Sequence, residues 1–190
     1  MYLGLSAFLD ANTERRELLL GQRPPRFDSS FDEAIALTGD DFERVALKAE
    51  SARDYFLLVG PPGTGKTSRA LRRMVEHFYA ASSMQILLLA YTNRAVDEIC
   101  QSLSSITPGI DYIRVGSELS CDVRFRGHLL ENILAECNSR REVNIRMADC
   151  RVYVGTVASI AAKAELFKLK RFDVAIVDLS LIHISEPTRP

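Results

Sequence analysis

One short segment has the residue types and spacing that phosphate binding requires. Residues 60–67 (GPPGTGKT) match the pattern G-x-x-x-x-G-K-[ST]. Its glycines let the backbone curl so that successive N–H groups point at phosphate oxygens. Lys66 supplies a compact cation for the β- and γ-phosphates of a nucleotide, and Thr67 supplies a hydroxyl for Mg²⁺. The residues of the predicted nucleotide-binding loop are Gly60, Pro61, Pro62, Gly63, Thr64, Gly65, Lys66, Thr67 and Ser68.

A second acidic element lies far downstream of this loop. Residues 172–178 (FDVAIVD) form an apolar run that ends in Asp178. Many buried strands end in an aspartate, but downstream of a phosphate-binding loop this pattern predicts a carboxylate that holds Mg²⁺. We therefore predict a nucleoside triphosphate and Mg²⁺ as cofactors, with Thr67 and Asp178 as metal ligands and Lys66 and Asp178 as catalytic residues; the family resemblance described below implies that the nucleotide is ATP.

The elements that must position these residues alternate between strands and helices. Short apolar runs predict buried strands at 55–59, 86–90, 112–115, 151–154 and 174–177. Helical spacing predicts helices at 1–23, 41–52, 94–103 and 157–169, another directly after the loop, and a largely helical stretch at 117–150. This alternation predicts an α/β fold whose parallel sheet is covered by helices on both faces.

Composition is consistent with one globular α/β domain. The 190 residues are 47% hydrophobic and 26% charged, and the net charge is -1. Any nucleic-acid binding must therefore come from local groups and not from a basic field. We find no secretory leader and no 18-residue apolar run, so we expect a cytoplasmic protein without a membrane partner. The four cysteines have irregular spacing, which favours reduced thiols over a zinc site.

Two further segments make the sequence resemble a known family. Residues 90–100 (AYTNRAVDEIC) and 154–160 (VGTVASI) are similar to two conserved motifs of superfamily-1 helicases. This group includes the nonsense-mediated-decay helicase and the replication nuclease-helicase. The resemblance covers about residues 40–178 and implies an incomplete RecA-like P-loop NTPase domain that stops at the acidic Walker B strand. It places that partial domain at 41–178, with a helical insertion at 117–150 and a helical or linker segment at 1–40.

The resemblance also implies residues that contact nucleic acid. The threonine of each motif binds a phosphate of the single strand in this family, which corresponds here to Thr92 and Thr156, with Asn93 as a neighbour. Both threonines also suit the N-cap of a following helix, and the two roles can coexist because helix N-termini bind anions. The implied function is that of an ATP-dependent helicase on single-stranded DNA or RNA, with 5′→3′ polarity.

Some features depart from the family pattern or leave alternatives open. Where the family has a glutamine that recognises adenine, this chain has Phe42 and Glu43. Tyr55 or Phe56 would either shape a base pocket or pack in the core. The alternative functions are a P-loop ATPase of another class coupled to protein partners, and a nucleotide-binding module without turnover. The oligomeric state is not predicted.

The last residues look foreign to the domain. Residues 179–190 (LSLIHISEPTRP) resemble a translated frame of a sequencing-library adapter, so we expect a non-native tail. Leu179 stands where the family has its general-base glutamate, so we expect the chain itself not to turn over ATP. In this class the next strand lies between 55–59 and 174–177. These two segments should therefore not pair, and their unpaired edges should make the chain prone to aggregation.

Overall fold

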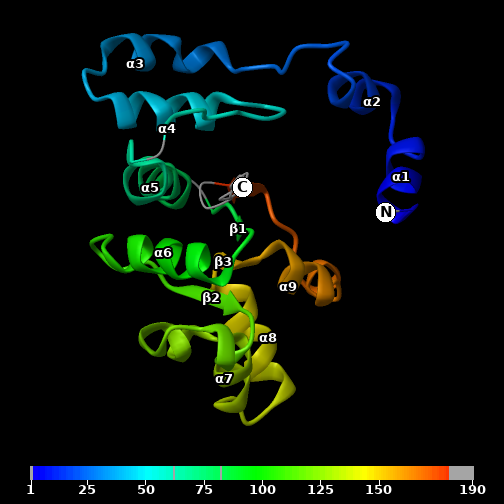
Figure 1. Ribbon diagram of the computed structural model, residues 1–190, viewed down its shortest axis with the longest axis vertical. Helices are drawn as coiled ribbons and strands as arrows, with labels where there is room; N and C mark the ends of the chain where they lie inside the picture. Colours follow the sequence, from blue (N-terminus) through cyan, green and yellow to red (C-terminus); the bar gives the residue numbers. More distant parts are fainter. Residues whose placement is uncertain (1, 62, 82, 180–190) are drawn as a thin grey trace, which may run out of the picture. The chain divides into compact units, whose positions relative to one another are not determined.

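The computed structural model describes residues 2–61, 63–81 and 83–179, which form two compact units (Figure 1). The first unit is Met1–Val59 and the second is Gly60–Pro190. The predicted partial motor domain, 41–178, and the linker, 1–40, stay predictions. Apart from Leu179, the predicted foreign tail lies outside the described residues, as does Pro62 of the predicted loop.

The first unit is helical and is held together by local caps. Its elements are α1 (Tyr2–Leu9), α2 (Thr13–Leu19), η1 (Ser29–Phe31), α3 (Asp32–Leu37) and α4 (Asp41–Ser51). The prediction of one helix over 1–23 is wrong, because Asn12 accepts a hydrogen bond from the Arg15 N–H and starts a separate helix. The predicted helix at 41–52 is confirmed as α4, which is capped by Asp40.

An acidic side chain near the end of the first unit is bound to the middle of that unit. The Asp54 carboxylate accepts hydrogen bonds from the guanidinium groups of Arg23, at 2.9 Å, and Arg26, at 3.0 Å. These hydrogen bonds hold the pKa of Asp54 well below its usual range. An antiparallel bridge between Phe27 and Ala52 lies beside them. The chain is therefore fixed just before the apolar run at 55–59.

The predicted strand at 55–59 is absent, which is a correction. These residues have no regular secondary structure, and Leu57 and Val59 are 75% and 91% exposed. A strand exists only where a neighbour pairs with its N–H and C=O groups. The apolar run indicates that the segment favours burial, but it cannot supply that neighbour.

The second unit is built on a four-stranded parallel sheet. Its strands are β1 (Ile86–Ala90), β2 (Tyr112–Val115), β3 (Val152–Thr156) and β4 (Val174–Asp178), in the order β2-β3-β1-β4. The other predicted strands are thus confirmed, although β3 extends to Thr156. Within the described residues, β4 pairs with β1. Because 55–59 forms no strand, the predicted arrangement with a further strand between it and 174–177 stays a prediction.

Helices cover both faces of this sheet, which confirms the predicted α/β class. On one face, α5 (Arg72–Ala81) packs on β1, and α6 (Asn93–Ser104) packs on β1 and β3. On the other, α7 (Leu130–Ala135) packs on β2 and α9 (Val157–Ala162) on β3. An apolar cluster fills that second face and includes Leu87, Ile113, Tyr153, Ile133 and Ile160. The predicted helix at 157–169 is broken, since α10 (Leu166–Leu169) is separate.

The stretch at 117–150 consists of short helices that adjoin β2 and β3. They are η3 (Glu118–Ser120), η4 (Val123–His128), α7 and α8 (Arg140–Asp149). The buried Lys170 ammonium donates to the carbonyls of Met147, at 2.8 Å, and Cys150, at 2.5 Å, at the end of α8. Cations are favoured at this end of a helix, where carbonyls lack partners within the helix.

No helix in the described part of the chain combines the length and apolar character that crossing a membrane requires.

Candidate nucleotide and nucleic-acid site

The predicted phosphate-binding loop requires glycine at two positions. Gly63 and Gly65 have φ angles of 80° and 81°, a left-handed conformation that costs other residues energy. Directly after them the chain enters η2 (Lys66–Leu71), a π-helical turn. The carbonyl of Gly65 accepts hydrogen bonds from the N–H groups of both Arg69 and Ala70, each at 2.9 Å. The loop is therefore followed by a wide π-helical turn, and this turn leads into α5.

The cation of the loop lies against the loop's own backbone. The Lys66 Nζ donates to the carbonyl of Gly60, at 2.5 Å, and to that of Pro61, at 2.7 Å. The Thr64 hydroxyl also donates to the Pro61 carbonyl, at 2.9 Å. An incoming phosphate would replace these carbonyls as the partner of the ammonium, because a charged acceptor makes the stronger hydrogen bond.

Two side chains with oxygen atoms that can bind a metal meet at the end of the loop, although they are far apart in the sequence. The Thr67 hydroxyl donates to the Asp178 carboxylate at 2.5 Å, across 111 residues of sequence. A hydroxyl and a carboxylate are hard oxygen donors of the kind that Mg²⁺ prefers. The residues present therefore fit the metal that a P-loop implies, and Thr67 and Asp178 would hold it.

The sheet register places the other predicted residues at the same end of the sheet, where the strands have their carboxyl ends. Ala90 lies opposite Thr156 on one side and Asp178 on the other, so the carboxyl ends of three strands form one row. Thr92 follows Ala90 by two residues at the start of α6. Ligands of open parallel sheets bind outside the carboxyl ends of the strands.

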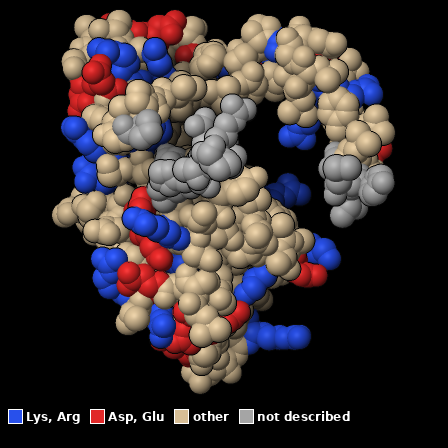
Figure 2. Space-filling model, in the orientation of Figure 1, with Lys and Arg blue, Asp and Glu red and all other residues tan. Residues whose placement is uncertain are grey.

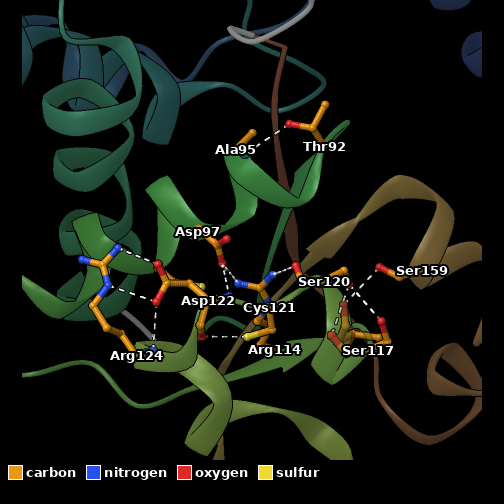
Figure 3. Close-up of polar contacts among 12 residues, drawn as sticks. Thr92, Ala95, Asp97, Arg114, Ser117, Ser120, Cys121, Asp122, Arg124 and Ser159 are labelled. Carbon is orange, nitrogen blue, oxygen red and sulfur yellow. Dashed lines mark hydrogen bonds and ion pairs between the residues drawn. The ribbon is translucent and has the colours of Figure 1, made fainter.

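Thr92 and Thr156 both cap helices, but only one of them is exposed. The Thr92 hydroxyl accepts a hydrogen bond from the Ala95 N–H at 3.2 Å (Figure 3). Both Thr92 and Asn93 are exposed. The Thr156 hydroxyl accepts from the Ser159 N–H at 3.0 Å, and Thr156 is only 8% exposed. The capping interpretation is thus observed for both, whereas a phosphate contact stays a prediction.

A buried ion pair beneath α6 was missed by the sequence predictions. Arg114 of β2 is 1% exposed and pairs through Nη1 with the Asp97 carboxylate of α6. Burial is the largest single influence and would lower the pKa of Arg114, but the hydrogen bond to Asp97 and the electrostatic attraction of neighbouring groups, Asp97 among them, together raise it. A charged residue within a four-residue apolar strand was the available signal.

A hollow of about 400 Å³ lies between the start of the loop helix and α6. Its lining residues are Thr67, Ser68, Arg72, Glu98, Gln101, Ser102 and Ser105. It borders the loop through Thr67 and Ser68, but the glycines do not line it.

The cysteines are free thiols, and Cys100, Cys121 and Cys150 are buried. Burial raises the pKa of Cys100 to about 12 and that of Cys150 to about 11, so both stay protonated at neutral pH. Phe42 and Glu43, which stand where the family has its adenine-recognising glutamine, belong to the first unit. Tyr55 and Phe56 belong to it too, and a role of either at the base stays a prediction.

Fold and site together define a P-loop nucleotide-binding domain: a parallel α/β sheet, a glycine-rich loop before a helix, and an aspartate that reaches the loop threonine. The chain belongs to the AAA domain family, which matches residues 38–146.

Named relatives agree with this class. The chain is 30% identical over 184 residues to the "DNA replication ATP-dependent helicase/nuclease JHS1" of Arabidopsis thaliana, covering 92% of this chain and 13% of the relative. It is 27% identical over 193 residues to the bovine "DNA replication ATP-dependent helicase/nuclease DNA2", covering 93% and 17%. The "Putative ATP-dependent RNA helicase ECM32" of Saccharomyces cerevisiae is 32% identical over 108 residues, covering 54% and 9%.

The predicted resemblance to superfamily-1 helicases is thereby confirmed. The chain spans less than one fifth of the length of each of these relatives.

Proposed function

We propose that this chain is the ATP-binding part of a helicase motor that moves along single-stranded DNA or RNA, with 5′→3′ polarity. The contact between Thr67 and Asp178 carries the proposal. It joins the end of the phosphate-binding loop to the carboxyl end of the sheet, where the caps of α6 and α9 also lie. A nucleotide and a nucleic-acid strand bound there would be close enough to influence each other.

The loop residues have separate roles toward ATP. The N–H groups around Gly63 and Gly65 would surround the phosphates, and the Lys66 ammonium would move from the loop carbonyls to the terminal phosphates. Thr67 and Asp178 would hold Mg²⁺, which neutralises phosphate charge when bound. Gly60, Pro61, Pro62, Thr64 and Ser68 complete the proposed loop site.

The nucleic acid would be held by local groups. On the face shown in Figure 2, basic and acidic side chains are interspersed over the second unit, in keeping with the net charge of -1. Thr92 and Asn93 at the start of α6, and Thr156 at the start of α9, therefore supply the proposed phosphate contacts through hydroxyl, amide and helix N-terminal N–H groups.

Turnover needs a group that this chain does not place after Asp178. Leu179 is 53% exposed and cannot accept a proton from an attacking water. Loss of a general base lowers rates by about 10²–10⁴-fold. We therefore expect nucleotide binding without appreciable hydrolysis, and we expect Leu179→Glu alone not to restore full turnover.

Nucleotide binding is tested by titrating a fluorescent ATP analogue with Mg²⁺. Lys66→Ala should weaken affinity at least about tenfold, because a charge-assisted contact to phosphate is lost. Lys163→Ala is the matched control, since Lys163 is a surface lysine paired with Glu131 at 3.0 Å. Equal affinities of wild type and Lys66→Ala would refute the assignment of the loop.

Nucleic-acid binding is tested with a fluorescent oligothymidylate and its ribonucleotide counterpart. Thr92→Ala should weaken binding several-fold, whereas Ser139→Ala should not. Ser139 caps α8 through the Glu142 N–H at 3.2 Å, so each variant loses the same kind of cap. If the two variants bind equally well, the P-loop ATPase coupled to protein partners becomes the better proposal.

A further inference from the structure

Polar contacts tie both α6 and α9 to strand β2, one through the Arg114 side chain and the other through the Val115 carbonyl. The two helices carry the proposed phosphate contacts Thr92 and Thr156, and β2 lies at the far side of β3 from β1. Figure 3 shows the participating side chains converging on the end of β2. None of them belongs to the proposed nucleotide loop.

On the α6 side, the contact is the buried ion pair. The Arg114 guanidinium binds the Asp97 carboxylate through Nη1 and the Ser120 carbonyl through Nη2, at 3.2 Å. The N–H of Asp122 also donates to Asp97, at 3.4 Å. Asp97 lies on α6 about one turn after Thr92, so the helix start is fixed to β2 and to the loop that follows it.

On the α9 side, the contact is a serine hydroxyl. Ser159 Oγ donates to the Val115 carbonyl of β2 at 3.0 Å and lies 2.8 Å from the Thr156 hydroxyl. The approach is close because residue 155 is glycine. A Cβ on Gly155 would lie 2.9 Å from the Val115 carbonyl oxygen and 3.2 Å from Ile160.

We propose that Arg114 is a positioning residue for single-strand binding: with Asp97 and Ser159 it sets the spacing between the helix starts that carry Thr92 and Thr156. The inference rests on the proposed function. Phosphates along a strand recur at a spacing set by the backbone, so two contacts act together only if their own spacing is fixed. Groups of this kind must be held within about 0.5 Å.

The ion pair suits this role better than a purely stabilising one. A buried ion pair adds little net stability over well-packed apolar residues, because desolvation offsets the attraction. A planar guanidinium instead fixes direction, since it binds the Asp97 carboxylate and the Ser120 carbonyl at once. Arg114 therefore restricts where α6 begins relative to β2.

The test measures oligothymidylate binding to the full chain by fluorescence anisotropy. Asp97→Asn should weaken binding about tenfold, and Asp97→Glu, which keeps the carboxylate, should recover part of that loss. Binding of the fluorescent ATP analogue should be unchanged in both. Asp111→Asn is the matched control, because Asp111 precedes the same strand and pairs with Arg146 on the surface, at 2.6 Å.

A double-mutant cycle separates positioning from a merely structural role. If Asp97 acts by positioning Thr92, then Thr92→Ala should cost little further affinity in the Asp97→Asn background. Additive losses would overturn the inference, as would wild-type affinity in Asp97→Asn. If Asp97→Asn does not fold, Ser159→Ala makes the same test from α9, with Thr156→Ala as the second substitution.

Failure of the inference and failure of the proposed function are distinguishable. If Thr92→Ala and Thr156→Ala bind like wild type, the proposed function is wrong and the positioning role falls with it. If Thr92→Ala weakens binding but Asp97→Asn and Ser159→Ala do not, only the positioning role is overturned.

Discussion

The two edges of the sheet differ in a way that their sequences do not suggest. The edge strand β2 contains Arg114, yet all of its residues are buried. The edge strand β4 is almost wholly apolar, yet its residues alternate between partly buried and exposed, and Val177 is 49% exposed. Burial in this protein therefore follows from what packs beside a strand and not from how apolar the strand is.

The cover of β2 comes from the residues that follow it. Leu129 bridges Arg114, and η4 and α7 pack on the strand. The Tyr112 and His128 rings also stack, with centroids 4.0 Å apart. On the other edge, the strand order within the described residues ends at β4. The segment 117–150 therefore covers the β2 edge of the sheet.

The largest difference in stability is expected between two variants that shorten one apolar side chain, one beside β2 and one in β4. Leu129→Ala should destabilise the second unit by about 3 kcal/mol, because Leu129 is 1% exposed and its loss leaves a cavity. Val177→Ala should cost less than about 1 kcal/mol, since the side chain is half exposed already. Urea unfolding of both variants measures the difference. Equal losses would mean that β4 is covered in solution.

The open edge is expected to control association. Val177→Lys should lower light scattering several-fold at high protein concentration, because a lysine on an edge strand opposes pairing with another chain. The control is Val123→Lys, since Val123 is 71% exposed but belongs to η4 on the covered side. Equal improvement in both would attribute the effect to net charge and not to the edge.

A smaller effect is expected where the covering segment is held to the sheet. The buried Tyr153 hydroxyl donates to the Met147 carbonyl in α8 at 2.9 Å. Tyr153→Phe should cost about 1 kcal/mol, the net value of a typical hydrogen bond. Tyr91→Phe is the control, because Tyr91 is 63% exposed. If Tyr153→Phe left the free energy of unfolding unchanged, the position of α8 would not depend on this contact.

The smallest effect is expected from lowering the pH, which should reduce stability slightly through Asp122 beside the covered β2 edge. Hydrogen bonds from Arg124 hold the pKa of Asp122 at about 2, below the value of about 3.9 expected when unfolded. A lowered carboxyl pKa adds stability that is complete above the unfolded pKa and is lost as pH falls toward the folded one. Wild type should therefore lose slightly more stability than Asp122→Asn between about pH 4 and pH 2. Chemical unfolding at several pH values measures this, and parallel curves would contradict it.

Local features of the chain were predictable from the sequence. The left-handed Gly63 and Gly65 and the caps at Thr92 and Thr156 follow from short-range sterics and hydrogen bonding, and most strands could be predicted from their apolar runs. The apolar run that ends in Asp178, downstream of the loop, also predicted that Asp178 serves the loop, and the structure brings it to Thr67.

Only the tertiary structure decided what depends on distant partners. The apolar run at 55–59 is not a strand because pairing requires a neighbour that its own sequence cannot encode. Arg114 can be buried because Asp97 and the Ser120 carbonyl, from other elements, accept hydrogen bonds from its two terminal nitrogens. The loop, the caps and the class of fold could thus be predicted from patterns of residues that lie close together in the sequence. The packing of the chain decided which edge is closed and which charges are buried, because those free energies depend on contacts between segments far apart in sequence.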